Sequence, residues 1–327
     1  MPGSPDRPLA PAQPAETPLR LRVALPDGAG VTDRPADPDR PAPWSRPDLR
    51  QRLDRLPPGH PSSPDLSPHR EAAPDARARS YWNEVSRFQN AWADHLRRWP
   101  ETSRAATVDR TRDPPGSWRG DANHYLSPDQ HAQAKDMITA VQQTEKSLTK
   151  DMRAVARDNT CGGRLAGMEF RLKGEDRLKE KLAEVLKRVP GRSADDAMRT
   201  LPDAIRYTFC FEAANYSDGH LEIKRRLEAC GNKMVYSKNH WRDDLEYKGI
   251  NTRWTTSEGQ RYEVQFHTVE SFHAKQQVTH GSYERLRNPL TAAQERSELR
   301  SFHRDVSSWI IAPEGVDNIS DYREEGL

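Results

Sequence analysis

The period of the apolar residues changes repeatedly between residues 163 and 288, and this change limits the possible folds more than any other feature. The segment YEVQFHT, residues 262–268, alternates strictly between apolar and polar residues. Such alternation is typical of a β-strand with one face on a core, and here it leaves Glu263, Gln265 and His267 together on the other face. Either a solvated sheet surface or a reaction site on the sheet explains this polar face.

The neighbouring segments alternate between strand and helix patterns. Strands are predicted at 163–173, 203–213, 233–238, 249–256 and 262–268, and helices at 174–189, 221–231, 271–288 and 291–310. The last three strands are joined by short connections, so part of the sheet is expected to be antiparallel. The predicted fold class is α/β in the α+β sense, a mixed and mostly five-stranded sheet flanked by helices.

Proline is concentrated at the beginning of the chain, where 18 of the 26 prolines lie between Pro2 and Pro74. Such a segment buries too little apolar area to offset its ordering entropy, so a disordered leader is expected over residues 1–77. Helical patterns at 80–99 and 127–157 follow, the second with a capping box of Ser127 and Gln130. After the leader, we expect the chain to consist of a helical part at 78–160, the sheet domain at 161–312 and a tail at 313–327.

Composition excludes several classes of protein. The formal net charge is only +2, which gives no reason to expect a general nucleic-acid binder. No stretch approaches the ~18 apolar residues of a membrane span, so no membrane partner is expected. The three cysteines form neither a disulfide framework nor a zinc motif, which favours a cytoplasmic protein with reduced thiols.

Two carboxylates lie in or beside the predicted strands. Asp203 follows Pro202 and is open to interpretation as a turn residue, and Glu263 as part of a solvated face. Around them lie cationic side chains near strand and helix ends, namely Arg171, Lys173, Lys181, Arg206, Lys238, Lys248 and His267. Two acids among many cations suit phosphoryl transfer with Mg²⁺, while the absence of a GxxxxGK loop argues against a P-loop enzyme.

Four blocks in order resemble the synthetase domain of RelA/SpoT-type alarmone synthetases, pyrophosphokinases with a nucleotidyltransferase-like fold. The blocks are RLKGEDRLKEKL, DAIRYTF, EYKGINT and YEVQFHT, within residues 165–287. A weaker similarity to the family's His-Trp-x-Tyr-Lys helix falls near His280 and Tyr283. The proline-rich beginning has no His-Asp hydrolase motif, so the resemblance implies a synthetase without a hydrolase.

The resemblance also implies residue roles. Arg171, Lys173 and Lys181 fall on ATP-binding positions, and Asp203 on the family's magnesium ligand. Glu263 falls on the catalytic glutamate, which is also expected to hold the metal. Tyr247 falls where the acceptor base is stacked. Further candidates for substrate binding are Arg206, Lys238, Lys248, Asn251, Gln265 and His267, the last replacing a cation only when it is protonated.

Several positions depart from the family pattern, most of them around the acceptor pocket. Thr208, Asn251 and His267 stand where the family has arginine, histidine and arginine. Arg177 stands in place of serine, and Glu246 in place of glycine.

Three functions remain open. The first is Mg²⁺-dependent transfer of pyrophosphate from ATP to the 3′-hydroxyl of GDP, GTP, ADP or ATP, giving (p)ppGpp- or (p)ppApp-type products. The second is a toxin of the same family that pyrophosphorylates the 3′ end of tRNA and has an antitoxin partner. The third is a catalytically inactive nucleotide-binding module, which the changes in the acceptor pocket favour and the retention of both acids disfavours.

Overall fold

The structure is a computed structural model that describes residues 72–100, 109–120, 123–288 and 290–325. All of these belong to the unit Pro61–Leu327. The expected disorder of residues 1–71 lies outside the described residues. Within the described part of the chain, no helix combines the length and apolar character needed to cross a membrane.

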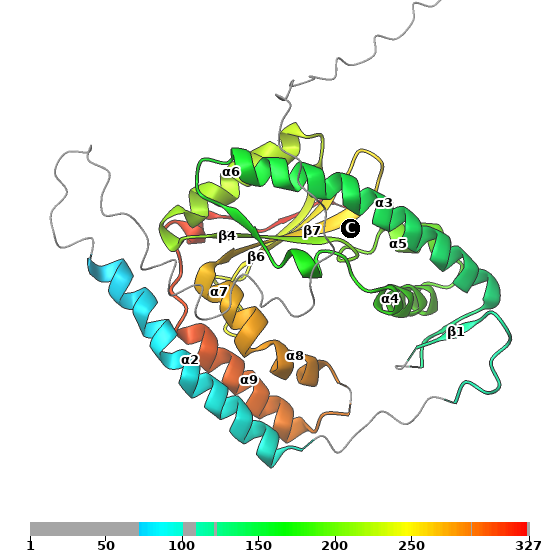
Figure 1. Ribbon diagram of the computed structural model, residues 1–327, viewed down its shortest axis with the longest axis horizontal. Coiled ribbons are helices and arrows are strands. Elements are labelled where there is room, and N and C mark those ends of the chain that lie inside the picture. Colours follow the sequence, from blue (N-terminus) through cyan, green and yellow to red (C-terminus); the bar gives the residue numbers. More distant parts are fainter. Residues whose placement is uncertain (1–71, 101–108, 121–122, 289, 326–327) are drawn as a thin grey trace, which may run out of the picture. The chain divides into compact units, whose positions relative to one another are not determined.

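The centre of this unit is a mixed sheet with the strand order β3-β4-β7-β6-β5-β8 (Figure 1). Its strands are β3 (Arg164–Ala166), β4 (Arg206–Phe211), β5 (Lys233–Asn239), β6 (Ile250–Thr255), β7 (Arg261–Thr268) and β8 (Tyr322–Arg323). β4 and β7 pair in parallel, and the other neighbours pair antiparallel. The predicted mixed sheet is confirmed, with the two-residue β8 added to the five expected strands.

One face of the sheet carries the core and is covered by α3 (Pro128–Asp158) and α6 (Tyr216–Ala229). The hydroxyl of Tyr207 on β4 lies 2.9 Å from that of Thr149 on α3. Tyr216 on α6 donates to the carbonyl of Phe266 at 2.8 Å. These contacts fix both helices on the apolar face, as expected for alternating strands with large side chains on one side.

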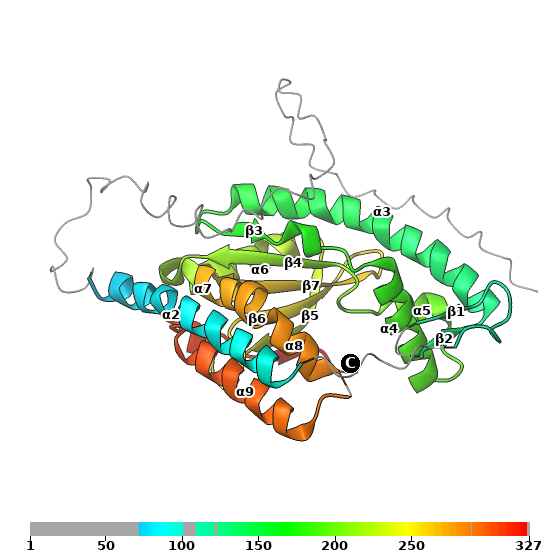
Figure 2. The same ribbon diagram turned by 60° about the horizontal axis from the view of Figure 1, so that its bottom comes forward.

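The opposite face is also covered, by α7 (Val269–His273) and the π-helical turn η3 (Ala274–Val278). α8 (His280–Arg287), α9 (Ala293–Ser308) and α2 (Ala72–Arg98) follow on the same side (Figure 2). Glu263, Gln265 and His267 are therefore only 9%, 5% and 0% exposed. The polar face of β7 is consequently not a solvated sheet surface.

The remaining elements lie beside this sheet. They are β1 (Trp118–Arg119), β2 (Tyr125–Leu126), η1 (Met168–Phe170), α4 (Glu175–Arg188), α5 (Ala194–Arg199), η2 (Ala213–Asn215) and η4 (Val316–Asn318). The capping box of α3 is present as predicted, since Gln130 N donates to Ser127 Oγ and Gln130 Oε1 accepts from Ser127 N.

Some expectations from the sequence differ from the structure. The strand expected over residues 163–173 ends at Ala166, because Gly167 takes the left-handed conformation (φ 61°) and starts a 3-10 turn that leaves Phe170 58% exposed. Helix α2 begins at Ala72, before the expected boundary at residue 78. The expected tail at 313–327 contributes η4 and the sheet strand β8.

Candidate active site

Asp203 and Glu263 lie on the same side of the sheet and share a cationic neighbour. Glu263 is the register partner of Arg206 across the parallel pair β4–β7, and Asp203 lies in the turn before β4. Arg206 lies 3.7 Å from Asp203 (Nη2 to Oδ2) and 3.5 Å from Glu263 (Nε to Oε1). Its Nε is buried and forms no hydrogen bond within the described residues. The guanidinium therefore lies between two carboxylates with donor capacity left unused.

Two lysines complete the surroundings of Asp203. Lys181 on α4 donates to both of its carboxylate oxygens, at 3.0 and 2.8 Å, and Lys173 Nζ lies 3.4 Å away. Lys173 is placed there by its backbone, whose N–H donates to the carbonyl of Ala204 at 3.0 Å. Burial alone would raise the pKa of Asp203, but the charge of Lys173 and the hydrogen bond from Lys181 bring it below its ordinary value.

Gln265 and Lys275 extend the site along β7. The Gln265 amide donates to Glu263 and accepts a hydrogen bond from the ammonium of Lys275 at the beginning of η3. Sequence reasoning identified Gln265 as a candidate but missed Lys275, whose only sequence signal is a lysine shortly after the YEVQFHT strand. Four cationic side chains thus surround two carboxylates, namely Lys173, Lys181, Arg206 and Lys275. This excess of positive charge suits a polyanionic ligand.

The two carboxylates fit a magnesium ion that is shared with a substrate. Mg²⁺ in proteins is commonly held by one or two carboxylates, with substrate phosphates and water as its other ligands. Asp203 and Glu263 supply that donor set on one side of the sheet, because both reach Arg206. The described residues contain no group of three or more His, Cys, Asp or Glu side chains that could hold a metal without such help.

A second polar cluster lies at the end of β7, around the predicted acceptor residue Tyr247. Its hydroxyl donates to Asn251 Oδ1 at 2.9 Å and lies 2.9 Å from His267 Nε2, while His267 Nδ1 lies 2.8 Å from Ser271 Oγ. Burial lowers the pKa of His267 well below its ordinary value, so its ring is neutral near pH 7. A consistent order of donors runs from Ser271 through His267 and Tyr247 to Asn251.

His267 therefore does not supply the positive charge that a protonated ring would carry. It holds the Tyr247 hydroxyl instead, and the Tyr247 and His267 rings meet edge to face with centroids 5.4 Å apart. The Asn251 side-chain oxygen accepts from Tyr247, and no residue that the structure describes accepts a hydrogen bond from its N–H₂ group, which leaves that group for a ligand. Tyr247 and its two partners thus form a mostly neutral polar cluster near Glu263.

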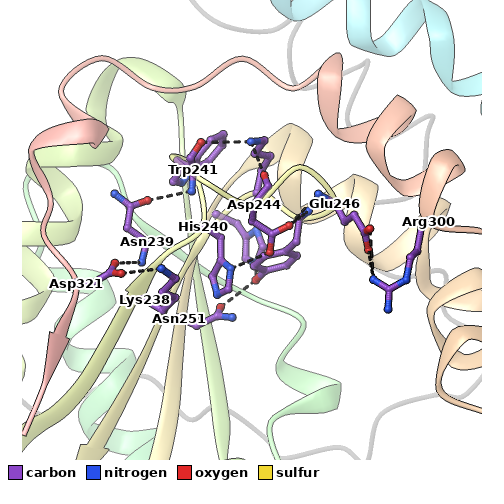
Figure 3. Close-up of polar contacts among 12 residues, drawn as sticks. Lys238, Asn239, His240, Trp241, Asp244, Glu246, Asn251, Arg300 and Asp321 are labelled. Atoms are coloured by element: carbon purple, nitrogen blue, oxygen red, sulfur yellow. Dashed lines mark hydrogen bonds and ion pairs between the residues drawn. The ribbon is translucent and has the colours of Figure 1, made fainter. Parts of the chain in front are cut away.

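The loop that carries Tyr247, residues 240–249, is shaped by Asp244. The Asp244 carboxylate accepts from the backbone N–H groups of Glu246 and Tyr247, at 2.8 and 3.1 Å, and lies 2.9 Å from His240 Nδ1. Glu246 pairs with Arg300 of α9 at 3.2 Å (Figure 3). The hydrogen bonds to Asp244 hold the backbone of Tyr247 in place without a ligand.

Three predicted site residues contact groups other than Asp203 and Glu263. Lys238 contacts Asp321 at 2.7 Å, since the pairing of β8 with β5 brings that carboxylate to β5 (Figure 3). Lys248 donates to the carbonyls of Trp241 and Asp244 at 3.2 and 2.7 Å. Arg171 donates to Glu145 of α3 at 2.6 Å and does not reach Asp203. The ammonium of Lys248 therefore holds the loop between β5 and β6, while that of Lys238 connects β5 with the segment before β8.

No family model matches the sequence, and no curated protein matches it either. Solved structures do. One is the complex of the Type VI effector Tas1 with its immunity protein, at 18% identity, over 54% of this chain and 94% of that chain, with a TM-score of 0.39. Another is small alarmone synthetase 1 from Bacillus subtilis bound to its product pppGpp, at 15% identity, over 54% and 92% of the two chains, with a TM-score of 0.39.

A third is a GTP pyrophosphokinase family protein from Streptococcus pneumoniae, at 15% identity, over 56% of this chain and 90% of that chain, with a TM-score of 0.37. The solved structures to which this chain is similar thus include alarmone synthetases, a protein of the GTP pyrophosphokinase family and an effector. Since these TM-scores lie below 0.5, the likeness by itself decides neither the activity nor the substrate of this chain.

Proposed function

We propose that this protein transfers the pyrophosphoryl group of ATP to the 3′-hydroxyl of an acceptor nucleotide. The observation that carries the proposal is the meeting of Asp203 and Glu263 at Arg206, within a surplus of positive charge. Polyphosphate substrates need that surplus, and hard divalent cations need the carboxylates. The motif resemblance at Arg171, Lys173, Asp203 and Glu263 agrees with the same reaction.

The residues have separate tasks in this reaction. The polyphosphate of ATP lies against Lys173, Lys181 and Arg206. In the structure these three cations all lie next to Asp203, which is itself a candidate metal ligand. Mg²⁺ held by Asp203 and Glu263 would neutralise phosphate charge as the bond to the leaving group breaks. Glu263 accepts the proton of the acceptor 3′-hydroxyl, whose oxygen forms a bond to the β-phosphorus. The bond between that phosphorus and the bridging oxygen breaks, and AMP leaves with the electron pair.

The acceptor is assigned to the polar cluster of Tyr247 and Asn251, where an aromatic ring and an amide offer stacking and a hydrogen bond to a nucleobase. Guanine nucleotides, adenine nucleotides and the terminal adenosine of tRNA all carry a nucleobase that stacks on an aromatic ring and forms a hydrogen bond with an amide. The proposal therefore covers both an alarmone-type product and a modified tRNA end, with an antitoxin as a partner in the second case.

The test is an assay with purified protein, Mg²⁺ and ATP labelled at the γ-phosphate. GDP, GTP, ADP, ATP and tRNA serve in turn as acceptors, and Glu263→Gln serves as the control. The proposal predicts labelled acceptor and an equal amount of AMP with at least one acceptor. Tight nucleotide binding without transfer to any of the five would establish the inactive binding module instead.

A further inference from the structure

Lys275 enters the active site from an unusual turn of helix. It lies in η3, residues Ala274–Val278, where the chain widens into a π-helical turn with Thr279 N donating to the carbonyl of Ala274 at 2.8 Å. Single π turns within helices are rare and occur frequently at functional sites. Here the turn lies over the polar face of β7 and brings the Lys275 ammonium to the Gln265 side chain.

The ammonium of Lys275 has no counter-charge of its own. Among the residues that the structure describes, no carboxylate lies within 4.0 Å of its Nζ as an ion-pair partner, and its hydrogen bond goes to the neutral amide of Gln265. Burial, together with the nearby charge of Arg206, lowers the pKa of Lys275 to about 8, although the charge of Glu263 opposes the shift. At pH 7 the side chain is still mostly charged, and an unpaired charge in such surroundings destabilises the fold.

We propose that Lys275 is a catalytic residue that contacts phosphoryl oxygens of the group being transferred. This inference rests on the proposed function. Gln265 connects Lys275 to Glu263, the proposed acceptor of the 3′-hydroxyl proton, so the ammonium lies beside the reacting oxygen atoms. A bound polyphosphate would give the Lys275 ammonium the anionic partner that it lacks among the described residues.

The role of Lys275 is electrostatic and involves no proton transfer. During the reaction the 3′-oxygen bonds to the β-phosphorus, its proton passes to Glu263, and the bond to the bridging oxygen of AMP breaks. Negative charge then grows on the phosphoryl oxygens and on the leaving group. A fixed ammonium aimed at that charge stabilises the transition state more than the ground state.

The experiment compares the full-length wild type with Lys275→Met, a substitution that keeps the length of the side chain and removes its charge. We expect kcat for pyrophosphate transfer to fall about 100-fold, the range found when one preorganised donor is removed. We also expect binding of inorganic tripolyphosphate, measured by titration calorimetry, to weaken about 10-fold. The melting temperature should stay unchanged or rise, because a partly buried charge without an ion-pair partner is lost.

The matched control is Lys224→Met, which removes a half-buried lysine on α6, on the other face of the sheet. Its transfer rate and its affinity for tripolyphosphate should equal those of the wild type. Two results would overturn the inference. One is Lys275→Met with kcat and tripolyphosphate affinity within about threefold of the wild type, a change below the charge-assisted range. The other is a loss of rate that parallels a lower melting temperature, which indicates a structural role.

The failure of the proposed function would be distinguishable from the failure of this inference. If the wild type transfers pyrophosphate to no acceptor, the reaction is excluded, and the assignment of Lys275 as a catalytic residue is overturned with it. The tripolyphosphate titration then still decides whether the Lys275 ammonium binds phosphate. If the wild type transfers pyrophosphate and the Lys275→Met rate is unchanged, only the role of Lys275 is overturned.

Discussion

Asp203 and Glu263 are brought to the same guanidinium by adjacent parallel strands, with Arg206 at 3.7 Å from one carboxylate and 3.5 Å from the other. The two acids are separated by the whole of β5 and β6 along the chain. Their shared neighbour places both on one side of the sheet. Had they projected from opposite sides, they could not hold one divalent cation together.

The first prediction concerns these two acids. Asp203→Asn and Glu263→Gln should each lower kcat for pyrophosphate transfer by about 1,000-fold or more, because each removes a proposed metal ligand and Glu263→Gln also removes the proposed proton acceptor. The measurement is release of AMP from ATP in the presence of the best acceptor. Asp218→Asn, an exposed acid on α6, is the control and should leave the rate unchanged. A variant at position 203 or 263 with more than a tenth of the wild-type rate would argue against the assignment.

The second prediction concerns the pH dependence of stability. Lys173 and Lys181 hold the pKa of Asp203 below its ordinary value of 3.8 in spite of burial. A carboxylate with a depressed folded pKa stabilises the fold above its unfolded pKa, and that stabilisation is lost as the pH falls through the folded pKa. Asp203→Asn should therefore lower the free energy of unfolding at pH 7 and have less effect near pH 2. Urea unfolding at both pH values checks this, and an equal effect at both would contradict it.

The third prediction concerns the acceptor pocket. Tyr247→Phe removes the hydroxyl that connects Asn251 with His267. The acceptor KM should rise about 10-fold, in line with the loss of one or two hydrogen bonds, while the KM for ATP stays the same. Tyr236→Phe on β5 is the matched control and should change neither constant. Equal increases in both KM values for Tyr247→Phe would place the residue outside the acceptor pocket.

The fourth prediction concerns the loop that carries this tyrosine. Asp244→Ala removes the carboxylate that accepts from the backbone N–H groups of Glu246 and Tyr247. We expect the acceptor KM to rise by about 10-fold or more, because the ring is no longer held in place. Glu246→Ala breaks only an exposed ion pair with Arg300 and Arg304, so kinetics and stability should change little. Steady-state kinetics with varied acceptor would show whether the two variants differ as expected.

The fifth prediction concerns His220 of α6, a fully buried imidazole against the Phe266 ring. Burial lowers the pKa of His220 to about 4. A base with a depressed folded pKa stabilises the fold above its unfolded pKa of 6.5 and loses that contribution as the pH falls toward 4. His220→Leu should therefore remove up to roughly 3 kcal/mol of the decline in unfolding free energy between about pH 7 and pH 4. Unchanged slopes in urea unfolding at these pH values would contradict this.

The fold could be predicted from the sequence wherever the spacing of apolar residues distinguishes a strand from a helix. The alternation in YEVQFHT predicted that Tyr262, Val264 and Phe266 are buried, and all three are fully buried in β7. The helix from Pro128 was predicted from its cap. Gly167 interrupts a similar alternation, and its left-handed backbone starts the 3-10 turn that leaves Phe170 exposed. Period alone cannot show such a turn.

Less of the candidate site than of the fold could be predicted from the sequence. The four motif blocks identified Asp203 and Glu263, but their meeting at Arg206 depends on the parallel pairing of β4 with β7. The position of Lys275 depends on a π-helical turn, which leaves no periodic signal. Lys238 was a candidate for substrate binding, and its contact with Asp321 could not be predicted because the pairing of β5 with β8 joins segments far apart in the chain.

The central claim is that two acids and a cluster of cations transfer pyrophosphate as one unit. Phosphorus NMR of a reaction of the wild type with ATP, Mg²⁺ and the acceptor tests it most directly. The predicted result is a pyrophosphoryl group on the acceptor 3′-oxygen together with an equal amount of AMP. Cleavage of ATP to ADP and phosphate, or unchanged ATP with every acceptor including tRNA, would contradict it.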